Sequence, residues 1–230
     1  MHFSIIIPTL NESAGIEACL LALQALRPAC ELIVADGGSV DDTVKLAAAW
    51  VDKVLVSKPG RASQMNFGAE KAIGDVLVFL HADTYLPGHA LEQITAHLDD
   101  AHHWGRFDVQ LSGQHFMLKI IAFMMNWRSR LTGIATGDQV LFVTRTAFTA
   151  AGAYPEIALM EDIALSKALN KISKPVCLKA KVTSSGRRWQ QHGVFQTILL
   201  MWWLRGCFAC GVHPDKLAAI YAKGRLWKRG

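Results

Sequence analysis

The chain has 230 residues and a mass of 25.3 kDa, which fits one domain or one domain with a small appendage. Hydrophobic residues make up 51% and charged residues 19%, so a large core can form, and intrinsic disorder, collagen-like repeats and a disulfide-stapled miniprotein are excluded. The formal net charge is +5. All of this excess lies from Arg205 onward, where six basic residues accompany one acidic residue. Charge confined to a tail argues against a nucleic-acid-binding face and suits an anionic membrane surface.

The number of cysteines and the first residues of the sequence both indicate in which cellular compartment the protein is found. Five cysteines form no even framework, which favours a reducing environment. The first residues have no basic stretch and only a short apolar run, which is typical of a buried strand rather than a signal peptide. We therefore expect a cytoplasmic protein. Cys207 and Cys210 form a C-x-x-C near His213, but without a second pair we expect them not to bind zinc.

The first hundred residues alternate short apolar runs with amphipathic stretches. We expect strands at residues 3–7, 31–35, 53–56 and 76–80. We expect helices at residues 17–26, with Leu20, Leu21 and Leu23 facing inward, at 41–50, and at 62–73. The second of these helices is expected to open with a capping box from Ser39. This alternation predicts an α/β fold with a mostly parallel sheet, which binds its ligand at the carboxyl ends of the strands.

The second half is less regular. Residues 106–111 and 140–143 are expected strands, and a helix is expected to begin at Glu161 and Asp162. Residues 116–127 predict a very apolar helix, which we expect to lie in the core. The apolar run at residues 194–212 is interrupted by Arg205, so it favours an interfacial or core helix over a membrane span.

The expected strand ends carry polar residues but no glycine-rich phosphate loop. Neither G-x-G-x-x-G nor G-x-x-x-x-G-K-[ST] follows the first strand. The second strand ends in Asp36-Gly37-Gly38, which permits a ligand to approach closely, with a plain turn as the alternative. The fourth ends in His81-Ala82-Asp83, where a carboxylate could hold Mg²⁺ or Mn²⁺ beside a diphosphate.

Six stretches, in this order, resemble the family 2 glycosyltransferases, and closely a small stand-alone bacterial branch of them. They are IIIPTLNE (5–12), DGGSVDDT (36–43), GRASQMN (60–66), FLHADT (79–84), GDQ (137–139) and EDIAL (161–165). The resemblance implies a glycosyltransferase A-type fold, a Rossmann-like, mostly parallel sheet flanked by helices. It implies a nucleotide-sugar-binding half at residues 1–100, an acceptor half at 101–190 and a C-terminal helical appendage at 191–230.

The resemblance also implies roles for individual residues. A UDP- or GDP-type sugar donor would contact Pro8, Thr9, Asn11, Glu12, Asp36, Gly38, Arg61 and Ala82. Asp83 would hold Mn²⁺ or Mg²⁺, although His81 replaces the first carboxylate of the usual motif. Asp162 matches the catalytic base, which takes the proton of the acceptor hydroxyl. The leaving group or acceptor would meet Gly137, Asp138, Gln139, Glu161, Arg187, Arg188 and Trp189. Ser185 stands where processive members carry a glutamine, so polymer synthesis is not supported.

The activity implied is an inverting, metal-dependent, hexosyltransferase-like transfer from a nucleoside-diphosphate sugar to a hydroxyl or phosphate acceptor. Apolar helices, Trp202, Trp203, Trp227 and the basic tail suit a peripheral membrane position and a lipid acceptor such as polyprenyl phosphate. A small soluble acceptor is the alternative. A non-catalytic nucleotide-sugar-binding module or sensor is the alternative of another class. A nucleotidylyltransferase is disfavoured, because the first loop lacks the required glycines and arginine.

Overall fold

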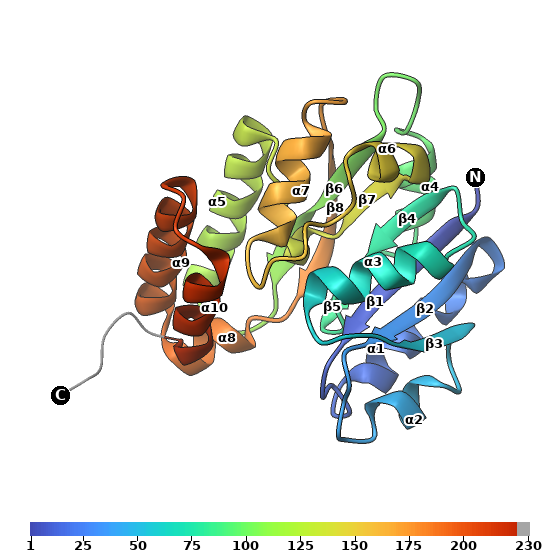
Figure 1. Ribbon diagram of the computed structural model, residues 1–230, viewed down its shortest axis with the longest axis horizontal. Coiled ribbons are helices and arrows are strands. Elements are labelled where there is room, and N and C mark those ends of the chain that lie inside the picture. Colours follow the sequence, from blue (N-terminus) through green and yellow to red (C-terminus); the bar gives the residue numbers. More distant parts are fainter. Residues whose placement is uncertain (225–230) are drawn as a thin grey trace.

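The computed structural model describes residues 1–224, except for the side chains of Arg188 and His192. The strands of this part are β1 (Phe3–Thr9), β2 (Cys30–Asp36), β3 (Lys53–Val56), β4 (Val76–Phe79), β5 (Thr84–Tyr85), β6 (Trp104–Leu111), β7 (Leu141–Thr144) and β8 (Val176–Ser184). They form one sheet in the order β3-β2-β1-β4-β7-β6-β8-β5 (Figure 1). Pairing is parallel from β3 to β4 and between β6 and β8, whereas β7 and β5 run antiparallel to their neighbours. The expected α/β fold with a mostly parallel sheet is confirmed.

Helices cover both faces of this sheet. They are α1 (Ile16–Leu23), α2 (Thr43–Ala47), α3 (Arg61–Lys71), α4 (Ala90–Thr95), α5 (Met117–Thr132), α6 (Arg145–Ala150), α7 (Glu161–Leu169), α8 (Arg187–His192), α9 (Val194–Ala209) and α10 (Pro214–Lys223). One hydrophobic cluster joins the sheet to α1, α2 and α4, and a second joins its other face to α3, α6 and α7. The sheet is therefore the middle layer of three.

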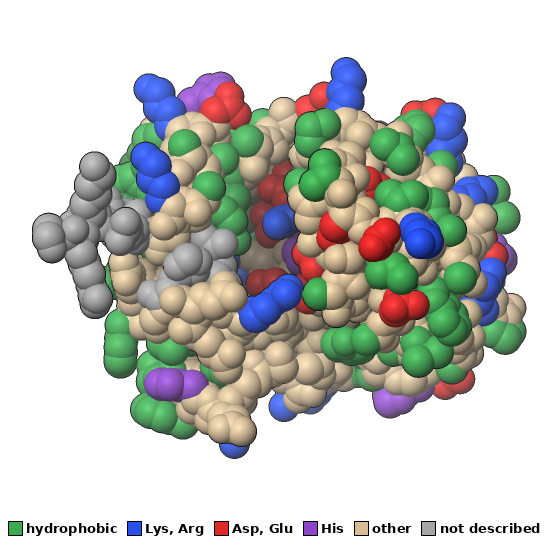
Figure 2. All heavy atoms as spheres, turned by 90° about the horizontal axis from the view of Figure 1, so that it is seen from below, with side chains coloured by type: hydrophobic (Ala, Val, Ile, Leu, Met, Phe, Trp, Pro, Cys, Tyr) green, Lys and Arg blue, Asp and Glu red, His purple; other side chains and the backbone are tan. Residues whose placement is uncertain are grey.

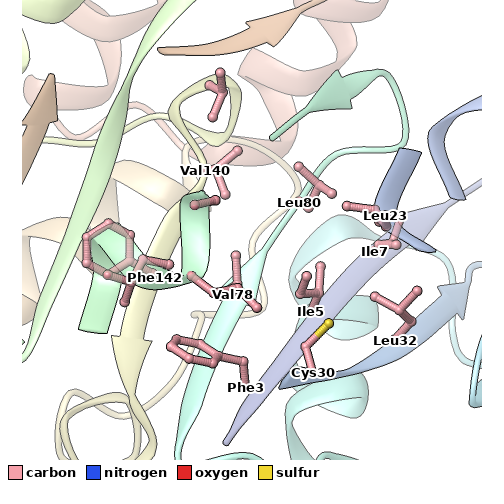
Figure 3. Close-up of a cluster of buried hydrophobic side chains, with 14 of the residues drawn as sticks. Phe3, Ile5, Ile7, Leu23, Cys30, Leu32, Val78, Leu80, Val140 and Phe142 are labelled. Atoms are coloured by element: carbon pink, nitrogen blue, oxygen red, sulfur yellow. The ribbon is translucent and has the colours of Figure 1, made fainter. Parts of the chain in front are cut away.

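The central strand β1 shows why the chain folds this way. Successive side chains of a strand point to opposite faces. Ile5 and Ile7 accordingly lie in the cluster beneath α1 (Figure 3). Ile6 lies in the cluster beneath α3. Each of these three side chains is 0% exposed. An uninterrupted aliphatic run is what a strand covered on both faces requires.

Several local expectations are corrected at the first helices. Helix α1 ends at Leu23, and a 3-10 helix that contains Pro28 follows it. Leu20 and Leu23 are buried as expected, but Leu21 is 58% exposed, because one residue turns a helix by about 100°. The capping box is also wrong: Asp42 is the N-cap residue of α2 and makes no side-chain cap. Ser39 instead donates its hydroxyl to Asp36.

The sequence pattern missed β5 and α4 within the first hundred residues, and α6 and β8 in the second half. The expected strands near residues 106–111 and 140–143 and the helix that begins at Glu161 are present. The expectation that the apolar helix α5 is a core helix holds for one side only. Leu118 and Ile121 are buried, but Phe116, Phe123 and Trp127 are 68%, 65% and 52% exposed.

The C-terminal helices pack on the start of α7. Leu200 and Leu204 of α9 and Leu217 of α10 form a cluster with Met160 and Ile163. Within residues 1–224, no helix has the length and apolarity that a membrane crossing needs. The basic residues Arg225, Lys228 and Arg229, together with Trp227, lie outside the described residues. A domain boundary at residue 190 stays a prediction.

Candidate functional site

A cavity of about 690 Å³ opens at the carboxyl ends of β1 and β4. Figure 2 looks into this hollow, in which acidic and basic side chains lie together between the sheet and the C-terminal helices. The lining includes Pro8, Thr9, Glu12, Arg61, His81, Ala82, Asp83, Gly137, Asp138, Glu161, Asp162, Arg187 and Trp189. Most of the residues singled out in the sequence therefore meet in one cavity, although they come from distant parts of the chain.

Asp36 lies beneath the cavity rather than on its surface. Its side chain is 1% exposed, and it is absent from the lining of the cavity. The carboxylate accepts hydrogen bonds from the backbone N–H groups of Gly38 (2.9 Å) and Ser39 (2.7 Å) and from the Thr9 hydroxyl (3.0 Å). Asp36 thus holds the loop after β2. Its contact with the base of a sugar donor stays a prediction, and such a contact requires that some of these hydrogen bonds be exchanged for bonds to the base.

Asn11 ties the loop after β1 to the loop after β2. It adopts φ of 54°, its amide oxygen accepts from the N–H of Val40 (2.9 Å), and its own N–H donates to Ser39 Oγ (2.8 Å). Like Asp36, it does not line the cavity. The geometry therefore supports a loop-positioning role for Asn11.

Gln64 of α3 is a cavity residue that the sequence reading missed. Its amide donates to the carbonyl oxygens of Thr9 (2.6 Å) and Ala35 (2.9 Å), which joins the ends of β1 and β2. In the sequence, the sign of this role is a polar amide side chain within the stretch of small residues that follows Arg61.

A cationic side chain lies beside the carboxylates at the ends of β1 and β4. Arg187 Nη2 is 3.5 Å from Asp83 Oδ2 and 3.9 Å from Glu12 Oε2. Burial raises the pKa of Glu12, with Arg187 acting in the opposite direction. Carboxylate oxygens are suitable ligands for Mg²⁺ or Mn²⁺. Among the described residues, no three His, Cys, Asp or Glu side chains are grouped for a metal, so the remaining ligands would come from the diphosphate and water.

His81 occupies the first position of the expected metal motif and contacts a different partner. Its Nδ1 atom lies 3.8 Å from Asp138 Oδ1, which also accepts from the Ser184 hydroxyl at 3.4 Å. Burial works to raise the pKa of Asp138, but His81, Arg61 and Ser184 together outweigh burial, and the pKa is lowered. An anionic Asp138 beside His81 therefore forms one wall of the cavity.

The start of α7 presents two adjacent carboxylates. Asp162 accepts from the N–H of Gly137 (3.1 Å) and from that of Ile163 (2.7 Å), which fixes its orientation. Glu161 is 3% exposed and binds Arg61 Nη1 at 3.3 Å. Burial and the neighbouring Asp162 raise the pKa of Glu161. Burial acts to lower the pKa of Arg61, but Glu161 and the other acidic groups nearby outweigh burial, and the pKa of Arg61 is raised.

The remaining sequence candidates are divided between the cavity and its surroundings. Gln139 is fully buried and absent from the lining; it accepts from the N–H of Thr136 at 3.3 Å and donates to Asn126 at 3.3 Å. Trp189 lines the cavity and packs against the cluster around Leu118. The side chain of Arg188 lies outside the described part of the structure.

The C-terminal helices add lining residues for which the sequence reading gave no role. These are Thr197, Met201 and Arg205 of α9 and Tyr221 of α10. The one available signal is Arg205, a charge within an apolar run. Cys207 and Cys210 are free thiols, and the described residues contain no group of three or more metal-ligating side chains around them.

Comparisons with known proteins connect this cavity to a family. The sequence profile of "Glycosyl transferase family 2" matches residues 4–152. A "PGL/p-HBAD biosynthesis glycosyltransferase" of Mycobacterium bovis is 38% identical over 94 residues, which are 36% of this chain and 36% of that protein. An uncharacterized glycosyltransferase of Haemophilus influenzae is 31% identical over 98 residues, 39% of each chain. The matched stretch thus spans little more than a third of these curated relatives.

Solved structures resemble a larger part of the chain. A mannosyltransferase from Pyrobaculum calidifontis in complex with GDP-Man and Mn²⁺ has a TM-score of 0.65 and 17% identity, covering 97% of this chain and 69% of that one. Glucosyl-3-phosphoglycerate synthase from Mycobacterium tuberculosis, in complex with Mn²⁺, UDP and phosphoglyceric acid, has a TM-score of 0.61 and 18% identity, and the match covers 92% of this chain and 79% of that one. Residues 1–349 of Staphylococcus aureus TarS, in complex with UDP-GlcNAc, have a TM-score of 0.64 and 18% identity, and the match covers 81% of this chain and 59% of that one. At these identities the likeness shows the fold, and it confirms the expected architecture.

Proposed function

The chain belongs to glycosyl transferase family 2, and from that premise we propose that it transfers a sugar from a nucleoside-diphosphate sugar to an acceptor, with inversion at the anomeric carbon. The observation that carries this proposal is that Asp83, which follows β4, and Asp162, at the start of α7, line one cavity. A cation-binding carboxylate and a separate, oriented carboxylate are the two groups that such a transfer requires.

The donor end of the cavity is the end that contains Asp83. The metal would be held by Asp83, with Glu12 beside it, and by the diphosphate. When bound, a divalent cation neutralises the charge that develops on the departing diphosphate. Arg187 adds a positive charge on the same side. The Mn²⁺ complexes of the similar structures with GDP-Man or UDP support a UDP- or GDP-type donor and Mn²⁺ or Mg²⁺.

Asp162 acts as the general base in this proposal. Its carboxylate takes the proton from the acceptor, either a hydroxyl or a singly protonated phosphate, as the oxygen that carried the proton forms the new bond to the anomeric carbon. The bond from the anomeric carbon to the diphosphate oxygen breaks at the same time, and the nucleoside diphosphate leaves. The hydrogen bonds from Gly137 and Ile163 hold the carboxylate in place for this step. No second carboxylic acid is needed, because the leaving group is stabilised by cations.

The acceptor is proposed to be lipid-linked, with polyprenyl phosphate as a candidate, because a large apolar face remains exposed. We define the apolar face as the exposed side chains of α5 (Phe116, Ile120, Phe123, Met124, Trp127, Leu131) and α9 (Phe195, Leu199, Trp202, Trp203). The two helices contact one another through the cluster of Leu118, Ile121 and Val194. Tryptophans on such a face, followed by a basic C-terminal sequence, suit the cytoplasmic surface of an anionic membrane.

Nucleotide binding and transfer test this proposal in two steps. Calorimetric titration with UDP and GDP, with and without Mn²⁺, is expected to show selective, metal-dependent binding that Asp83→Asn abolishes. Asp162→Asn is expected to keep that binding and to lose transfer of a radiolabelled sugar. Transfer that survives Asp162→Asn would remove the base assignment. Donor binding without any turnover in the unaltered protein, on lipid or soluble acceptors, would instead indicate a nucleotide-sugar-binding module.

A further inference from the structure

Two arginines on different helices hold buried nitrogen atoms that have no hydrogen-bond partner. They are Arg128 of α5, at Nε and Nη2, and Arg205 of α9, at Nε. Within the described residues, these are all the buried side-chain nitrogen or oxygen atoms that lack a partner. An unsatisfied buried donor on a charged group is costly, so a ligand that accepts from these atoms is expected.

Other arginines in the same region do have acidic partners. Arg106 and Arg130 both bind Asp108, and Arg61 binds Glu161. Arg130 is only two residues from Arg128 on α5. The chain therefore supplies a carboxylate to the arginines that hold its fold together, whereas none of the carboxylates in the described residues forms an ion pair with Arg128 or Arg205.

Of the two arginines, Arg205 is a lining residue of the cavity, whereas Arg128 lies near Arg205 without lining it. Arg205 lines the cavity together with Asp162. Arg128 is close enough to Arg205 that burial and this second positive charge lower the pKa of Arg128 to about 10, while Asp162 opposes them. Burial also lowers the pKa of Arg205, against the effect of Asp162 and Asp138. By contrast, the cation beside Asp83 is Arg187.

We propose that Arg128 and Arg205 form a subsite that binds a phosphate monoester group of the acceptor. Guanidinium groups donate paired hydrogen bonds to phosphate oxygens, and a phosphate monoester carries about −1.5 to −2 charge at neutral pH, which matches two arginines. This inference rests on the proposed transferase function and names its acceptor class. The phosphate binds between α5 and α9, and the acceptor is thereby positioned near Asp162.

The subsite is tested by direct binding of two phosphate monoesters, glycerol 3-phosphate and dodecyl phosphate, with and without saturating nucleotide and Mn²⁺. Both esters are expected to bind the unaltered protein. Arg128→Gln and Arg205→Gln are each expected to weaken this binding by roughly tenfold or more, because charge-assisted hydrogen bonds are lost. The affinity for nucleotide stays unchanged in both variants. Lys45→Gln is the matched control, since this exposed lysine of α2 lies at the far end of the molecule (Figure 1), and it leaves both affinities unchanged.

The two esters distinguish a soluble acceptor from a lipid acceptor. Equal affinities indicate a soluble phosphate ester, whereas tighter binding of dodecyl phosphate, with no binding of uncharged dodecyl maltoside, indicates a lipid phosphate. Both results support the subsite. Absence of phosphate binding in the unaltered protein would overturn it, as would glutamine variants that bind phosphate normally. A parallel loss of nucleotide and phosphate affinity would also overturn it, by assigning the arginines to the donor.

Thermal unfolding separates a binding role from a structural role. Because the glutamine variants remove a buried charge without a partner, their unliganded melting temperatures are expected to equal or exceed that of the unaltered protein, and phosphate no longer raises them. If a glutamine variant does not fold, the methionine variants Arg128→Met and Arg205→Met decide, because methionine removes the charge and the hydrogen-bond donors but keeps an unbranched side chain, and unchanged phosphate affinity in both would refute the subsite. Phosphate binding that persists without any nucleotide binding supports the subsite and rejects the proposed transferase function.

Discussion

The imidazole ring of His81 fills the space where residue 137 would carry a side chain. A Cβ atom on Gly137 would lie 2.2 Å from His81 Cε1 and 2.3 Å from Nε2. The N–H of this glycine is also the group that binds Asp162. The end of β4 and the start of α7 are therefore connected through one residue without a side chain.

Gly137→Ala is expected to displace His81 and to weaken the Gly137–Asp162 hydrogen bond. Insertion of a methyl group into a packed site costs about 1–3 kcal/mol, which denaturant unfolding will measure. Gly206→Ala is the control, because a Cβ on Gly206 of α9 meets nothing within 4 Å. That substitution is expected to stabilise the helix by about 0.5–1 kcal/mol. Equal effects of the two substitutions would contradict the steric relationship.

Asp162→Asn is expected to lower the transfer rate by roughly 10²- to 10⁴-fold, because the amide cannot accept the acceptor proton. The donor affinity should remain, because Asp83 and Arg187 are unchanged. Asp100→Asn makes the same chemical change at an exposed position outside the cavity, and is expected to leave the rate unaltered. Steady-state rates with radiolabelled donor provide the measurement, and equal rates for the two variants would contradict the assignment.

Arg187→Gln is expected to change metal and nucleotide binding in opposite directions. Without nucleotide, Arg187 competes with a cation for Asp83. Because exposed ion pairs are weak, its removal should tighten Mn²⁺ binding by roughly two- to fivefold, measured by electron paramagnetic resonance. Nucleotide affinity should fall, since a positive charge near the diphosphate is lost. Arg27→Gln, which removes the ion pair with Asp52 away from the cavity, is the control. Weaker Mn²⁺ binding in Arg187→Gln would contradict this model of competition.

Glu161→Gln is expected to gain stability relative to the unaltered protein as the pH rises. The pKa of Glu161 is raised in the folded state by burial and by Asp162. A raised pKa means that the folded state holds the proton more tightly, so stability is lost as the pH rises from the unfolded pKa through the folded one. Glutamine does not titrate. The difference in unfolding free energy, variant minus unaltered protein, should therefore increase from pH 4 to 8, and a decrease would reverse the assigned direction.

The apolar face is expected to bind vesicles that contain anionic lipid. Trp202→Glu and Phe123→Glu should each reduce cosedimentation with such vesicles, because a charge replaces an exposed apolar side chain on that face. Ile73→Glu changes an equally exposed residue at the end of α3 and should have no effect. Vesicle binding that all three variants retain would exclude α5 and α9 as the contact surface.

The sequence alone predicted most of the strands and helices of the first hundred residues. Runs such as Ile5–Ile7 and residues 76–80 are apolar throughout because both faces of a central strand are covered, and this local pattern needs no tertiary information. The ordered motifs also indicated that Asp83 and Asp162 belong to one site. By contrast, β8 was missed, although its exposed Lys179 and Lys181 alternate with the apolar side chains of residues 178, 180 and 182, which is the pattern of a half-buried strand.

Only the tertiary structure decided which side of each helix meets the core and which charges remain unpaired. The sequence of α5 is apolar on most of its circumference, so burial of Leu118 and exposure of Phe123 depend on where the sheet and α9 lie. Likewise, Arg128, Arg130 and Arg205 look alike in the sequence. Arg130 has Asp108 as a partner, whereas Arg128 and Arg205 have no acidic partner among the described residues. The difference arises because pairing depends on distances between elements that are far apart in the chain. Local composition fixes the strands, whereas long-range packing determines the chemistry of the cavity.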